Sequence, residues 1–153
     1  MGAFSYETPK VIEGFVEEGI VKIVSINIER ARSLIKESER KLRSLNSNLE
    51  KVGINADNAS DYVEHCYDLL MFLIRAKLYL MGYSASGQGA HEAEVSYLRN
   101  LGIGEKEVQF MDQLRYFRNG IIYYGSGLDQ EYAEKVINFT KSFYPQLKKK
   151  CMA

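Results

Sequence analysis

The chain has 153 residues, 46% of them hydrophobic and 26% charged, which is enough for one globular domain with a sizeable buried core. Its 20 basic residues are balanced by 20 acidic ones, so a polyanion-binding surface has to be a local patch. The two cysteines, Cys66 and Cys151, belong to no CxxC or Cys/His ligand set, and we expect no metal and no cofactor. Cys66 lies in an apolar run and is expected to be buried, whereas Cys151 is expected in a frayed tail.

The beginning of the chain lacks the basic and apolar regions of a signal peptide. The longest strongly apolar run, Leu69 to Ile74, is far shorter than a membrane span. We therefore expect a cytoplasmic protein with no membrane segment.

Apolar residues recur at helical spacing along most of the chain. The predicted helices cover residues 9–20, 28–52, 58–81, 91–101 and 105–124, and a last one from about 129 that Pro145 is expected to bend or end. No segment alternates as a strand would. The expected fold is all-α, an up-and-down bundle of about five helices in one domain over 1–153. In it a short N-terminal helix, 9–20, precedes a bundle core over about 27–147.

Two of these segments indicate how the bundle is built. Residues 28–52 carry an apolar seam at alternating steps of three and four, interrupted only by Ser38. Residues 58–81 are apolar on most sides, which favours a place at the centre. Residues 82–89, which contain three glycines and two serines, are expected to form a flexible loop.

Near the end of the predicted helix over 105–124, Arg118 and Asn119 are polar residues within an apolar helix, followed by Gly120. A buried guanidinium needs a partner or an anionic ligand. Arg118 therefore marks either a ligand site or a structural contact, in which it reaches the surface or pairs with an acidic side chain.

The order of these elements, together with Arg118-Asn119, resembles the HEPN domain over about residues 28–143. The resemblance implies a homodimer whose paired motifs form a cleft that cleaves RNA without metal, with Arg118 on the phosphate and Asn119 orienting the site. Family members carry a His after the Arg, with four to six residues between the two. Here Tyr123, Tyr124 and Gly125 occupy the corresponding places. The phenol of Tyr123 is a poor base near neutral pH.

Two histidines remain. His91 begins the fourth predicted helix; it is either a surface residue, which the helix start favours, or a replacement for the missing base. His65 has too few neighbouring ligands for a metal and is expected to be exposed or hydrogen-bonded. The candidate catalytic residues are Arg118, Asn119 and Tyr123, and the candidate ligand-binding residues are Arg118, Asn119, Tyr124, His91 and Arg115.

Three functions follow from this reading. The first is a HEPN-like homodimeric module that binds a nucleotide, RNA or a protein without catalysis, as one half of a toxin–antitoxin-type pair with a nucleotidyltransferase partner. The second is a metal-independent endoribonuclease that uses Arg118 and Asn119. The third is a helical scaffold in which Arg118 is purely structural.

Overall fold

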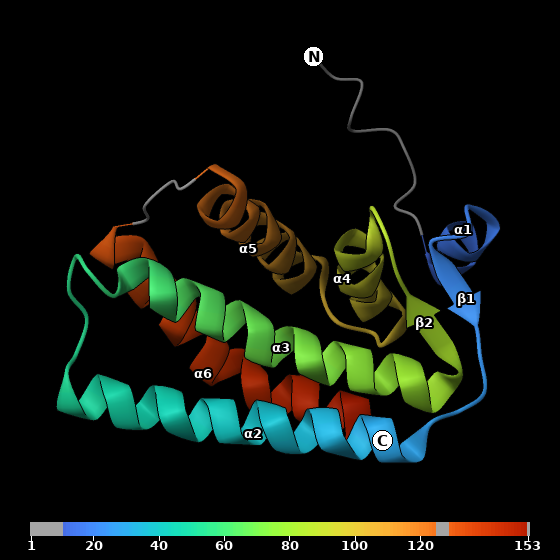
Figure 1. Cartoon of the computed structure of the whole chain (residues 1–153), viewed down its shortest axis with the longest axis horizontal. Coiled ribbons are helices and arrows are strands. Elements are labelled where there is room, and N and C mark those ends of the chain that lie inside the picture. The colour runs from blue at the N-terminus through green and yellow to red at the C-terminus, as the bar shows by residue number, and fades with distance from the viewer. Residues whose placement is uncertain (1–10, 125–128, 153) are drawn as a thin grey trace.

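The computed structural model describes residues 11–124 and 129–152, which form six helices and two short strands (Figure 1). The elements are α1 (Ile12–Glu17), β1 (Val21–Ile23), α2 (Ile28–Lys51), α3 (Ala59–Met81), β2 (Tyr83–Ala85), α4 (Ala90–Asn100), α5 (Glu105–Tyr124) and α6 (Gln130–Met152). This confirms the predicted all-α bundle. No helix within the described ranges is long and apolar enough to cross a membrane.

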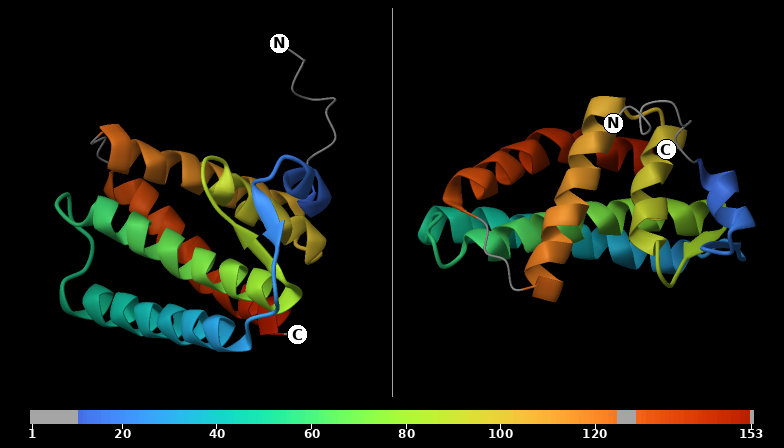
Figure 2. Two further views of the ribbon diagram at one scale, coloured as in Figure 1. Left: turned by 45° about the vertical axis from the view of Figure 1, so that its right-hand side comes forward. Right: turned by 90° about the horizontal axis from the view of Figure 1, so that it is seen from above.

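Helix α3 lies at the centre of the bundle, as its apolar circumference predicts. It packs against α2 and α6 on one side, and α4 and α5 pack together across its other side (Figures 1 and 2). Burial of such side chains is the main stabilising term in the fold. The buried residues of α3 are Ala59, Tyr62, Val63, Cys66, Tyr67, Leu69, Leu70, Met71, Leu73, Ile74, Ala76 and Leu78.

A two-stranded antiparallel sheet contradicts the expectation of a chain without strands. β1 pairs with β2 in the register Val21↔Ala85, Lys22↔Ser84 and Ile23↔Tyr83. Three-residue strands are too short to produce a readable alternation. β2 also replaces part of the loop expected at 82–89. The remaining loop residues, 86–89, connect β2 to the beginning of α4.

Gly82 makes the close turn from α3 into β2 possible. Its φ of 81° is in the left-handed region, and its carbonyl accepts a hydrogen bond from the N–H of Val24 at 2.8 Å. A Cβ at this position would lie 2.9 Å from the Val24 carbonyl oxygen. Glycine is therefore needed both for the backbone angle and for the contact with the segment after β1.

The interruption of the α2 seam by Ser38 is a buried polar contact. The Ser38 hydroxyl donates to the Leu69 carbonyl at 2.6 Å and lies 3.1 Å from the Tyr144 hydroxyl. Because a buried hydroxyl is stable only with partners, this serine fits its position by linking α2 to α3 and α6.

Both ends of the chain differ from the prediction. The helix expected at 9–20 is shorter, because α1 ends at Glu17 and a turn follows with Gly19 at a φ of 78°; its first expected residues lie outside the described ranges. At the other end, Pro145 does not terminate α6, which continues to Met152. Buried Leu147 and Cys151 anchor the turns beyond the proline, so Cys151 is a core residue rather than part of a frayed tail.

Candidate functional site

A pocket of about 470 Å³ lies between the beginning of α4 and the middle of α5. On α5, Arg115 and Asn119 are one helical turn apart and therefore face the pocket together. The opposite wall is the loop that follows β2 and the first residues of α4. The lining residues are Gly87, Gln88, Gly89, Ala90, His91, Glu92, Arg115 and Asn119.

The structure thus brings together three of the predicted ligand-binding residues, His91, Arg115 and Asn119. The side chain of His91 is half-buried at the beginning of α4 and lines this pocket together with Arg115 and Asn119. The turn set by β2 and by Gly89, at a φ of 86°, places the start of α4 opposite α5. That contact depends on the tertiary fold and has no local sequence signal.

His91 is held by Tyr67 of the central helix. The Tyr67 hydroxyl lies 3.2 Å from His91 Nδ1, and the tyrosine is buried, with only 1% of its surface exposed. Burial lowers the pKa of His91, and the positive charges of Arg75, Arg118 and Arg115 lower it further against the opposing effect of Glu94. A neutral imidazole at pH 7 is the result.

Arg118 lies beside the pocket rather than in its lining. Its guanidinium carbon is 5.3 Å from the centre of the Tyr67 ring, and Nη2 is 3.7 Å from Asp68 Oδ1. The Nε atom is buried and makes no hydrogen bond within the described part of the chain. The cation–π contact and the loose ion pair of Arg118 are what a structural role predicts. Its unsatisfied donor is what a ligand-binding role predicts.

A buried ion pair between α3 and α4 stabilises this arrangement. Arg75 of α3 donates from Nε to Glu94 Oε2 at 2.6 Å and from Nη2 to Glu94 Oε1 at 3.0 Å. Only 2% of the Glu94 side chain is exposed. The bidentate contact joins α3 to α4 and so fixes the helix that carries His91. Glu94 precedes the inward-facing Leu98 by four residues, a spacing that could have identified it as a buried carboxylate.

Two carboxylates lower the positive charge of the pocket. Arg115 donates from Nε to Asp112 Oδ1 at 3.0 Å, and its Nη2 lies 2.9 Å from the same oxygen. The exposed carboxylate of Glu92 forms part of the pocket wall. No side chain caps the beginning of α4 at Gly89. The pocket therefore offers converging donors in a nearly neutral setting.

The predicted roles of Tyr123 and Tyr124 remain predictions. Both residues belong to α5, but their side chains lie outside the described part of the structure. The sequence also gave no reason to select Tyr67, which lies inside an apolar run and resembles a core aromatic residue. Its hydroxyl is the feature that links His91 to the α5 residues.

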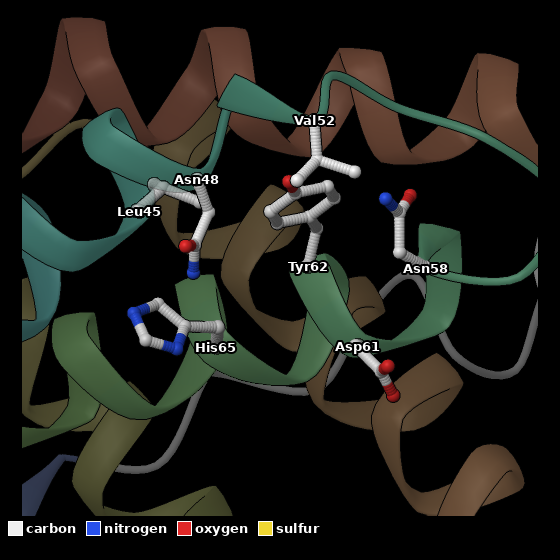
Figure 3. A pocket seen from close by; sticks show the side chains of 7 residues that line it. All are labelled: Leu45, Asn48, Val52, Asn58, Asp61, Tyr62 and His65. Carbon is white, nitrogen blue, oxygen red and sulfur yellow. The ribbon is translucent and has the colours of Figure 1, made fainter. Parts of the chain in front are cut away.

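His65 belongs to a second, smaller pocket of about 280 Å³ where α2 and α3 join (Figure 3). Its Nε2 lies 2.7 Å from the Lys41 carbonyl oxygen, which confirms the expected hydrogen-bonded role. The side chain of Asn48 points toward the imidazole, while Asp61 points away from it. Within the described ranges, no three His, Cys, Asp or Glu side chains are grouped to hold a metal ion.

The arrangement around α4 and α5 can bind an anion through nitrogen donors and can exchange a proton at His91. Compared with protein-family models, with curated proteins and with solved structures, the chain has no match.

Proposed function

We propose that the chain is a HEPN-like binding module that holds a phosphate group of a nucleotide or RNA between α4 and α5. The observation that carries the proposal is the pocket in which His91, Arg115 and Asn119 meet. Guanidinium, amide and imidazole groups are the nitrogen donors that recur at phosphate sites. Arg118 does not line the pocket, but its guanidinium lies over the ring of Tyr67, whose hydroxyl contacts His91.

Binding of fluorescein-labelled RNA and of labelled AMP, followed by anisotropy, tests this proposal. Arg115→Ala should weaken binding by about 10-fold, because a charge-assisted contact to phosphate is lost. Arg32→Ala is the matched control: it removes the same charge from an exposed position on α2, which α3 separates from the pocket. Failure of the wild-type protein to bind either probe, or equal effects of the two variants, would contradict the proposal.

A second candidate, a metal-independent endoribonuclease, is favoured by the place of His91. An imidazole in the same pocket as Asn119 supplies the proton-transfer group that the segment after Arg118 lacks. Under this proposal the purified protein cleaves RNA in the presence of EDTA, and His91→Gln and Arg118→Ala each abolish cleavage. RNA that stays intact with a folded, RNA-binding wild-type protein leaves the binding module as the function.

We also propose that the protein is a homodimer through α5. Tyr116 is 70% exposed and Phe117 is 37% exposed, and the centroids of their rings are 5.6 Å apart. Exposed neighbouring aromatic residues are typical of protein interfaces. Light scattering at micromolar concentration should give twice the chain mass for the wild type and a lower mass for Tyr116→Glu. A monomeric wild type would refute this part of the proposal.

A further inference from the structure

We infer that the pocket between α4 and α5 selects a phosphate monoester over a phosphodiester, and that His91 takes up a proton when the monoester binds. This inference rests on the proposed function and narrows it. It states which kind of phosphate the pocket accepts and which side chain supplies the compensating charge.

The charges that surround the pocket argue against a chain of phosphates. Arg115 is shared with Asp112, and Arg118 is near Asp68. Glu92 adds a further negative charge to the wall. A protein that follows a nucleic-acid backbone needs a net positive surface for several successive phosphates. Here the phosphates next to the first one would meet Glu92 and Asp112, so the pocket suits a single terminal phosphate.

The donors in the pocket match a terminal phosphate better than a bridging one. A monoester has three free oxygens and a charge of about −1.5 to −2 at pH 7, whereas a diester has two free oxygens and a single charge. Asn119 can donate through its amide, Arg115 through the Nη1 that Asp112 does not engage, and His91 through its ring. Three donors from two helices therefore face three acceptors.

His91 is the group in the pocket wall that can gain positive charge near neutral pH. A bound dianion favours the protonated imidazole, so binding should draw a proton from solvent. The charged and titratable groups that act on His91 are Tyr67 and Arg75 of α3, Glu92 and Glu94 of α4, and Arg115 and Arg118 of α5. Burial is the main reason that the ligand-free imidazole stays neutral, and Asp112 and Asp68 offset the charges of Arg115 and Arg118, so the bound phosphate is what changes its state.

The contact with Tyr67 is compatible with both states of His91. A phenol hydroxyl both donates and accepts, so it can donate to Nδ1 of the neutral ring and accept from Nδ1–H of the charged ring across the same 3.2 Å. Nε2 is then left for the ligand. Tyr67 acts as a positioning residue, because it orients the imidazole through a contact that does not depend on the proton.

Titration calorimetry with AMP and with cyclic AMP tests the choice of phosphate, because the two share base and sugar and differ in having a monoester or a diester. At pH 6.5 we expect AMP to bind at least ~10-fold more tightly than cyclic AMP, because the monoester can make one more charge-assisted hydrogen bond. Between pH 7 and pH 8, AMP affinity should fall by up to ~10-fold, the limit for uptake of one proton. The heat of binding should also differ between buffers of different ionisation enthalpy.

His91→Gln keeps a hydrogen-bonding side chain but cannot take up a proton. This variant should bind AMP about 10-fold more weakly at pH 6.5 and lose the dependence on pH and buffer. His65→Gln is the control, since His65 lies in the other pocket, and it should retain both. Circular dichroism of each variant establishes that it is folded.

Two RNA oligomers that differ only in a 5′-phosphate or a 5′-hydroxyl identify the source of the monoester. Tighter binding of the phosphorylated oligomer points to RNA ends, and binding of AMP alone points to free mononucleotides; both outcomes support the inference. Equal binding of the two oligomers, with AMP no tighter than cyclic AMP, would overturn it and leave the proposed phosphate-binding function in place. Absence of binding by every probe would overturn both.

Discussion

The ion pair between Arg75 and Glu94 gives the sharpest test of how the site is supported. Glu94→Gln keeps the shape of the side chain but leaves the Arg75 guanidinium without its charge partner, and only 27% of the Arg75 side chain is exposed. Removing one partner of a fully buried pair costs about 3–5 kcal/mol; because Arg75 retains some solvent, we expect a loss of about 2–3 kcal/mol in the free energy of unfolding.

Urea denaturation at pH 7 measures this loss as a fall in the midpoint of about 1–2 M, for a typical urea dependence of a small domain. Glu105→Gln is the matched control: it breaks an Arg99–Glu105 pair whose carboxylate side chain is 49% exposed, and it should cost less than about 1 kcal/mol. Equal midpoints for the two variants would refute the reasoning. In the double variant Arg75→Met/Glu94→Leu, stability should recover, because no charge is left buried alone.

Three further outcomes follow from buried polar groups. Ser38→Ala should lower the free energy of unfolding by about 1–2 kcal/mol, since the Tyr144 hydroxyl loses its partner; a change in melting temperature within error would contradict this. Burial raises the pKa of Cys66 to about 11 and of Cys151 to about 12, so a disulfide reagent at pH 8 should label both only as fast as the protein unfolds; rapid labelling of the native protein would show an exposed thiol. Burial holds the pKa of His91 below its ordinary value of 6.5 in the folded state, so the unfolded chain binds the proton first as pH falls. Wild type should therefore lose more stability than His91→Gln between pH 7 and pH 5, and equal losses in urea titrations would exclude this contribution.

The helices could be predicted because each is long enough to repeat its pattern and is bounded by residues that stop it. Gly53 and Gly82 follow α2 and α3 with positive φ, as expected of helix terminators. The strands could not, because their pairing joins residues about sixty positions apart and each is only three residues long. Pro145 misled the prediction for a related reason: burial of the residues beyond it outweighs the loss of one helical hydrogen bond.

Some residues of the candidate site could likewise be predicted from the sequence and others could not. Asn119 could be selected because it and Arg118 are polar residues within an apolar helix, and Arg115, one turn earlier, lies on the same face as Asn119. His91 could be named but not placed, since its distance from α5 depends on a turn between two other elements. Tyr67 could not be found at all, because an aromatic residue in a buried helix looks the same whether or not its hydroxyl has a partner.

The Ser38 contact has a consequence for how the three long helices are aligned. Leucine-rich seams repeat, so α2 could slide along α3 by a turn and still bury apolar side chains. A slide of one turn, about 5.4 Å, would separate the Ser38 hydroxyl from both the Leu69 carbonyl and the Tyr144 hydroxyl and leave it unpaired in the core. One small polar residue thus makes a single lengthwise alignment of α2, α3 and α6 preferable to its neighbours.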